Sequence, residues 1–205
     1  MWWRELQAQQ RSLRWQFGDQ SVRVDPSAWV APTARLDASR GPIIIGSRTR
    51  VCENAYIEGP VAIGDDCMIG NMAMIRGPVY IGNGTRIGFA TEIKSAIIQD
   101  RVTIGPQCFV ADSKIEREAY LGAQVRTSNH RLDKQNVQVV VDGEPIDTGM
   151  DKLGCLIGAR SALGIQVIIL PGRVIAADSI FAPRITVEKN LPSGRYRQPQ
   201  QLETY

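Results

Sequence analysis

Aliphatic side chains recur at every sixth position along most of the chain. From residue 45 the frame is unbroken over nine positions: Ile45, Val51, Ile57, Ile63, Ile69, Ile75, Ile81, Ile87 and Ile93. The step shortens to five residues at Ile98 and again at Ile115, and the frame resumes from Ile157 to Val187. A period of six fits neither an α-helix, which repeats near 3.6, nor an isolated strand, which alternates at two.

A longer repeat of 18 residues lies above the hexads. Gly-Pro followed by an aliphatic run occurs at 41–46, 59–64 and 77–82. Since three hexads make one such repeat, each repeat predicts a triangular coil of three short parallel strands. The aliphatic residues would point inward, and glycine would supply the corner conformations. The sequence therefore predicts an all-β fold, a parallel β-helix of hexapeptide repeats, whose handedness does not follow from the period.

Two segments lie outside the hexad frame. Residues 2–16 place Trp2, Trp3 and Leu6 among polar residues, which predicts a short amphipathic helix capping the first coil. The segment 127–156 breaks the frame, and its Asp-Gly pair predicts a hairpin within one protruding arm. The expected division is a helical cap at 1–21, coils at 22–126, the protruding loop or arm at 127–156, final coils at 157–188 and a tail at 189–205.

Composition narrows the class of protein. The chain has 205 residues, of which 43% are hydrophobic and 22% charged, as expected of a folded domain. A net charge of +3 is too small to argue for nucleic acid as a partner. No apolar run reaches membrane-spanning length, and the first residues do not resemble a secretory signal. The four cysteines form no C-x-x-C pair and fit reduced core thiols, so we expect a cytoplasmic protein.

The single histidine, His130, stands at the start of the frame-breaking segment, next to Asn129 and three residues before Asp133. A neutral imidazole there could accept a proton from a hydroxyl or amine that attacks a thioester, with a carboxylate or a carbonyl on the other ring nitrogen holding the tautomer. Asn129 and nearby backbone N–H groups could bind the oxyanion. The alternative is an exposed loop histidine without a role. One histidine also argues against a metal site needing several imidazoles from one chain, and no metal is expected.

The hexapeptides of residues 22–188 resemble the hexapeptide-repeat acyltransferase superfamily, and this resemblance implies a left-handed β-helix. Within it, Glu92–Ile98, Asn129–Asp133 and Asp147–Gly158 resemble the C-terminal half of sugar-1-phosphate nucleotidyltransferases. In the bifunctional glucosamine-1-phosphate enzymes that half acetylates an amino sugar. It forms trimers with acetyl-CoA bound between subunits. The resemblance thus implies a homotrimer, acetyl-CoA as co-substrate and a sugar or small-molecule acceptor.

Two features modify this resemblance. That family has its catalytic histidine just before a Tyr-Val-Gly-Asp-like stretch, and the matching segment of this chain, Pro106–Asp112, contains no histidine. In compensation, the Asn-His-Arg-Leu-Asp of 129–133 resembles the Asn-His-Arg-Met-Asp of xenobiotic O-acetyltransferases, whose histidine is the base. The closing coils also resemble those enzymes, where a groove between coils holds pantetheine. The cofactor-binding residues implied are Gly158, Ser161, Lys189 and Arg195, with Arg197 also near the CoA phosphates.

Two functions from different classes follow. The first is acetyl transfer from acetyl-CoA to a sugar, a sugar phosphate or a small-molecule hydroxyl or amine, with His130 as base in a ternary complex. The second is a catalytically silent trimeric scaffold or ligand-binding relative, which the missing family histidine favours. A solvated basic tail is the alternative to phosphate binding by Lys189 and Arg195. Cys67 and Cys108 fall in the small inward column, which favours core packing over nucleophilic catalysis.

Overall fold

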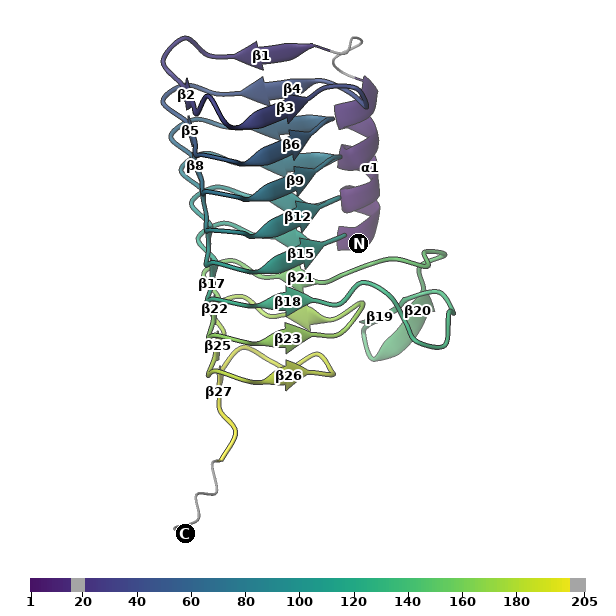
Figure 1. Cartoon of the computed structure of the whole chain (residues 1–205). Helices are drawn as coiled ribbons and strands as arrows, with labels where there is room; N and C mark the ends of the chain where they lie inside the picture. The colour runs from purple at the N-terminus through teal and green to yellow at the C-terminus, as the bar shows by residue number, and fades with distance from the viewer. Residues whose placement is uncertain (16–20, 200–205) are drawn as a thin grey trace.

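The computed structural model describes residues 1–15 and 21–199, so parts of the expected cap and tail lie outside the described residues. The chain winds into a left-handed parallel β-helix with three sheets, one helix along its side and one projecting hairpin (Figure 1). The expected fold class is therefore confirmed. No helix of the described segments is long and apolar enough to cross a membrane.

Each sheet runs along the solenoid axis and takes one strand from each coil. The first sheet comprises β1 (Val22–Val24), β4 (Ile43–Ile45), β7 (Val61–Ile63), β10 (Val79–Ile81), β13 (Ile97–Ile98), β16 (Lys114–Ile115), β21 (Leu156–Ile157) and β24 (Val174–Ile175). The second comprises β2 (Trp29–Val30), β5 (Arg50–Val51), β8 (Met68–Ile69), β11 (Arg86–Ile87), β14 (Thr103–Ile104), β17 (Tyr120–Leu121), β22 (Ala162–Leu163), β25 (Ile180–Phe181) and β27 (Arg195–Tyr196). The third comprises β3 (Arg35–Asp37), β6 (Tyr56–Glu58), β9 (Met74–Arg76), β12 (Glu92–Lys94), β15 (Phe109–Ala111), β18 (Arg126–Thr127), β23 (Ile168–Ile169) and β26 (Thr186–Val187).

The strand register confirms the hexad column. Ile45 pairs with Ile63, and Ile63 pairs with Ile81, one full coil apart in each case. These side chains are buried in one continuous core that extends to Val187. Ile81 pairs with Ile98, which makes that coil one residue shorter, as the five-residue steps predict.

The prediction that glycine supplies the corner conformations is wrong for most corners. The left-handed corner positions are mostly occupied by residues with side chains, such as Arg48 at φ 53° and Asp66 at φ 57°. The glycine that follows the inward aliphatic residue instead permits close approach of successive coils. A Cβ on Gly46 would lie 2.7 Å from the backbone of Gly64. Glycine is therefore needed for coil spacing, because a Cβ would push neighbouring coils apart.

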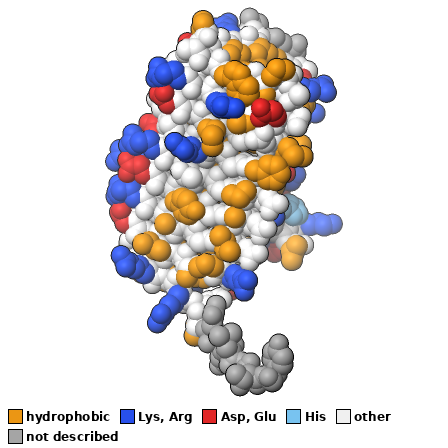
Figure 2. Space-filling model, turned by 60° about the vertical axis from the view of Figure 1, so that its left-hand side comes forward, with side chains coloured by type: hydrophobic (Ala, Val, Ile, Leu, Met, Phe, Trp, Pro, Cys, Tyr) orange, Lys and Arg blue, Asp and Glu red, His pale blue; other side chains and the backbone are white. Residues whose placement is uncertain are grey.

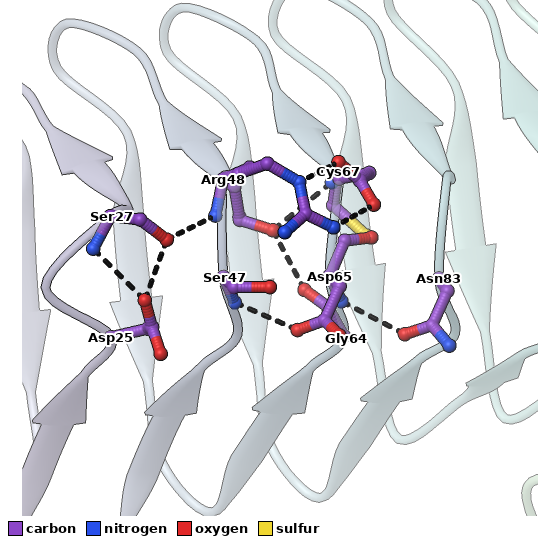
Figure 3. A network of polar contacts seen from close by, with 10 residues as sticks. Asp25, Ser27, Ser47, Arg48, Gly64, Asp65, Cys67 and Asn83 are labelled. Atoms are coloured by element: carbon purple, nitrogen blue, oxygen red, sulfur yellow. Dashed lines mark hydrogen bonds and ion pairs between the residues drawn. The ribbon is translucent and has the colours of Figure 1, made fainter.

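Polar side chains join successive coils at the corners (Figure 3). The buried Thr49 hydroxyl donates to the carbonyl of Gly64 at 2.7 Å and accepts the N–H of Cys67 at 3.0 Å. Nearby, Asp65 Oδ1 accepts the N–H of Ser47 at 2.7 Å. Each bond satisfies a backbone group that the corner leaves unpaired, so the coils are held in register along the axis.

The helix α1 (Trp2–Trp15) lies along the first sheet instead of over the end of the first coil (Figure 1). Trp2, Trp3 and Leu6 are buried in a cluster that includes Ile97 of β13. Glu5 forms an ion pair with Lys114 at 2.7 Å. The expected capping position is therefore wrong. The physical reason is that the outer face of the first sheet is apolar here, and covering it removes that surface from water.

The frame-breaking segment forms the predicted hairpin from β19 (Gln138–Val141) and β20 (Glu144–Asp147), which are antiparallel. Its tight turn is at Gly143, whose φ is 87°. Val137 and Val139 are buried in the same cluster as the tryptophans of α1. The hairpin is thus packed against the helix and the first sheet, and this arrangement positions the base of the arm, residues 128–133.

Candidate functional site

His130 lies at the base of the arm, three residues beyond the end of β18. Its backbone forms an antiparallel bridge with Lys152, so the outgoing and returning segments of the arm meet there. The exposed imidazole lines a cavity of about 510 Å³, here called the His130 cavity. The other lining residues are Ser128, Arg131, Leu132, Asp133, Gln138, Leu170, Pro171 and Arg173. The arm and the coil corner at Leu170 therefore form a concave site around the only imidazole of the chain.

Asn129 anchors the arm to the preceding coil. Its Nδ2 donates to Asp112 Oδ2 at 2.6 Å, and Lys94 Nζ lies 3.7 Å from the same oxygen. Burial raises the pKa of Asp112, while the bond from Asn129 and the charge of Lys94 oppose the rise. The Asn129 carbonyl also accepts the N–H of Leu153 at 2.9 Å. This amide, expected to bind an oxyanion, is thus engaged in holding the loop next to His130.

Asp133 is close to His130 in sequence but pairs with Arg131. Arg131 Nε lies 2.9 Å from Asp133 Oδ1, and its NH2 group contacts Oδ2. These bonds, together with the N–H of Gln135, lower the pKa of Asp133 to about 2. Among the described residues, the carboxylate expected to hold the imidazole tautomer is therefore engaged by a guanidinium.

Arg173 is a site residue that sequence reasoning missed. It precedes β24, and its Nε is buried without a hydrogen-bond partner among the described residues. Burial, and secondarily the charge of Arg131, lower the pKa of Arg173. The preceding Gly172 has φ 75°, and a Cβ on it would lie 2.2 Å from the carbonyl of Gln138. Gly172 allows the coil corner to approach the arm closely. Its presence next to Arg173 was the feature of the sequence that could have pointed to this arginine.

The expected cofactor residues fall in two places. Ser161 is buried and donates to the Ala176 carbonyl at 2.9 Å, so its hydroxyl is engaged between coils. A Cβ on Gly158 would lie 2.5 Å from the backbone of Ala177, which makes this glycine another coil contact. Lys189 and Arg195 are exposed. Gly158 and Ser161 therefore lie in the wall of the solenoid, whereas the side chains of Lys189 and Arg195 are open to a ligand.

Two further cavities lie near the tail and the third sheet. One, of about 950 Å³, is lined by Ile165, Ala182, Pro183, Arg184, Arg197, Gln198 and Pro199. The second, of about 400 Å³, is lined by Gln124, Arg126, Gln166, Ile168, Arg184 and Thr186. Arg184 borders both. Because β18 and β23 lead from the second cavity to Ser128 and Leu170, the three cavities follow one another from the tail to His130.

The sequence model of the family described as the GMPPB C-terminal domain matches residues 57–191. YaiX, an uncharacterized acetyltransferase of Escherichia coli O6:K15:H31, is 57% identical over 173 residues, covering 84% of this chain and 75% of that protein. The chain belongs to the hexapeptide-repeat acyltransferase superfamily. The resemblance found in the sequence is thereby confirmed, and the function of this superfamily member is acyltransferase-like.

Two more distant similarities complete the comparison. A bifunctional sugar-1-phosphate nucleotidylyltransferase/acetyltransferase of Sulfurisphaera tokodaii is 34% identical over 107 residues, covering 52% of this chain and 27% of that enzyme. The chain thus spans about a quarter of that relative's length. The structure of a UDP-N-acetylglucosamine acyltransferase from Campylobacter jejuni matches 82% of this chain and 72% of that one, with 17% identity and a TM-score of 0.44.

Proposed function

We propose that this superfamily member transfers an acetyl group from acetyl-CoA to a hydroxyl or amine of a sugar or another small molecule, with His130 as general base. The observation that carries the proposal is the position of the chain's single imidazole. It lines the His130 cavity, at the end of a series of cavities that begins at the basic tail.

The proposed chemistry is direct transfer in a ternary complex. Neutral His130 accepts the proton of the acceptor's hydroxyl or amine as that group attacks the thioester carbonyl. The tetrahedral intermediate then expels the CoA thiolate, which takes up the proton from the imidazolium. An acyl-cysteine intermediate is disfavoured because burial raises the pKa of Cys108 to about 11 and that of Cys155 to about 12. Neither thiol supplies a thiolate near neutral pH.

We place CoA along the third sheet. The exposed strand faces of β18 and β23 offer an extended surface between the tail and His130, and a strand rises roughly 3.3 Å per residue. Arg184 and Arg197 border the larger tail cavity and would receive phosphate groups. Lys189 and Arg195 on the exposed tail would add positive charge. The thioester would then lie toward Ser128 and His130.

The homotrimer is part of the proposal, and its support is the resemblance together with the exposed apolar surface. Figure 2 shows apolar side chains spread over the face that carries the second sheet. Met68, Tyr120 and Ile180 are each at least 39% exposed on outward positions of that sheet. Burial against neighbouring copies would remove this surface from water. All four cysteines are free and buried, which supports the cytoplasmic location that we propose.

The test compares the unaltered protein with His130→Gln. Turnover is followed as thiol release from acetyl-CoA with a panel of neutral, amino and phosphorylated sugars, and CoA binding is followed by thermal shift. We expect His130→Gln to lower kcat roughly 100-fold or more and to retain CoA stabilisation, since a general base contributes about 10²–10⁴. Gln135→Ala, an exposed change five residues away in the arm, is the matched control.

Two outcomes contradict the proposal. Turnover within twofold of the unaltered protein would remove His130 from the mechanism. Absence of both thiol release and CoA stabilisation would instead support the catalytically silent scaffold, which the lack of a histidine in Pro106–Asp112 favours.

A further inference from the structure

Arg173 carries a positive charge that no group in the described part of the chain balances. Its Nε is buried and has no hydrogen-bond partner there. Several other arginines of the coils form ion pairs, such as Arg48 with Asp66 and Arg160 with Asp178, each at contact distances of 2.6–2.7 Å. Taking a guanidinium partly out of water without a partner is unfavourable, so an unpaired one requires an explanation.

The surroundings of Arg173 are those of a binding site. It lines the His130 cavity together with Ser128 and Gln138, which offer a hydroxyl and an amide. Arg131 also borders the cavity, but its guanidinium is engaged by Asp133. The uncompensated charge facing this cavity is therefore that of Arg173. Both nearby carboxylate oxygens of Asp133 are already in use.

The position of Arg173 is fixed by the backbone. Gly172 contacts the arm so closely that a Cβ there would lie 2.2 Å from the Gln138 carbonyl. The Arg173 carbonyl accepts the N–H of Leu156 at 3.0 Å, which ties the residue to the returning end of the arm. The backbone of Arg173 is thus fixed between the coil corner and the arm, so the residue is placed at the His130 cavity before a ligand arrives.

We propose that Arg173 recognises a phosphate group of the acyl acceptor and orients the reacting hydroxyl or amine toward His130. This inference rests on the proposed acyl transfer, because it assigns the second substrate of that same cavity. The planar guanidinium fork matches the oxygen geometry of a phosphate group. An anion there supplies the missing partner of Arg173, and desolvation in the cavity strengthens the pair.

CoA carries phosphates as well, and the structure separates the two sources. Arg184 and Arg197 border the cavity at the tail, whereas Arg173 borders the cavity at His130. If the phosphates of CoA bind at the tail cavity, Arg173 is free to bind the anionic group of the acceptor. Substitution of Arg173 should therefore weaken the binding of phosphate, whereas substitution of Arg184 should weaken the binding of CoA.

The binding experiment uses the full chain with inorganic phosphate, CoA and dephospho-CoA as separate probes. Arg173→Gln should weaken phosphate binding roughly 10-fold or more, because hydrogen bonds to charged groups are the strong ones, and should change the Kd of CoA less than about threefold. Arg184→Gln should weaken CoA binding instead. Arg160→Gln removes the same charge from an exposed ion pair and is the matched control. Arg173→Gln should melt at the same or a higher temperature than the unaltered protein, since an unpaired charge is lost.

The kinetic experiment compares phosphorylated and neutral forms of the same amino sugar. Arg173→Gln should lower the ratio of kcat/KM for the phosphorylated over the neutral form roughly 10- to 100-fold, and Arg173→Lys should restore part of it. Unchanged phosphate affinity in Arg173→Gln overturns the inference. A loss of CoA affinity without loss of phosphate affinity also overturns it and assigns Arg173 to CoA. Phosphate binding is measured without turnover, so a failure of His130-dependent transfer is seen separately.

Discussion

Replacing Asn129 by alanine tests whether this residue anchors the arm. The substitution removes the bond of 2.6 Å from Nδ2 to Asp112 Oδ2. The Asp112 side chain is only 14% exposed, so water replaces the lost donor poorly. A hydrogen bond to a charged group contributes about 1.5–3 kcal/mol, and we expect Asn129→Ala to lower the free energy of unfolding by that amount near neutral pH.

The loss should depend on pH in a defined direction. Burial raises the pKa of Asp112 above its ordinary value, whereas the bond from Asn129 lowers it. Removing Asn129 therefore raises this pKa further. A raised carboxylate pKa favours folding when the group is protonated, and this stability is lost as pH rises through the folded-state pKa. The loss of unfolding free energy in Asn129→Ala should consequently be largest above the folded-state pKa of Asp112. It should shrink as the pH falls toward the ordinary pKa of an aspartate.

Urea unfolding followed by circular dichroism at about pH 7.5 and about pH 4.5 measures both effects. Asn136→Ala is the matched control, because this exposed asparagine of the same arm contacts only the exposed Asp147, at 3.3 Å. It should change stability by less than about 0.5 kcal/mol. A loss below that value for Asn129→Ala, or an equal loss at both pH values, would refute the anchoring role.

Two further substitutions test the scaffold. Thr91→Val should destabilise more than Thr91→Ser, by about 1–3 kcal/mol in urea unfolding, because the buried hydroxyl donates to the Gly105 carbonyl at 2.8 Å and accepts the Cys108 N–H at 3.1 Å; the reverse order would contradict this account. Trp3→Ala should increase amide hydrogen exchange in β19, since Trp3 is 3% exposed in the cluster that holds the hairpin, whereas exposed Arg4→Ala should not. Unchanged exchange in β19 would show that α1 does not hold the arm.

The coil architecture could be predicted because it depends on a local repeat. Each inward residue, such as Ile63, contacts its counterparts 18 residues away in both directions, so one period in the sequence specifies every contact. The shortened steps before Ile98 and Ile115 were equally readable and appear as shorter coils. The place of α1 could not be predicted in this way. It depends on an apolar patch around Ile97 that the outward positions form only when the coils are stacked.

The candidate site was predictable only where the frame breaks. His130 could be found because it starts the single long interruption of the hexads. The partner of Asn129 could not, since Asp112 is 17 residues away and is brought close by the coil. Arg173 could not be predicted, because it belongs to no sequence motif. Its significance comes from the absence of a hydrogen-bond partner for its Nε within the described residues and from the contact of Gly172 with the arm.

The two anchors of the arm show which part of the site is free to vary. At its base, Asn129 is bound to Asp112, and beyond it Val137 is buried against the helix. Between these fixed points, Leu132 is fully exposed, and the Arg131–Asp133 pair stands at the cavity rim. Substitutions in this short segment alter the cavity without disturbing core or anchors. Under the proposed acyl transfer, acceptor preference can therefore change there while His130, the coils and the tail cavity stay in place, which is how loops on a rigid scaffold carry specificity.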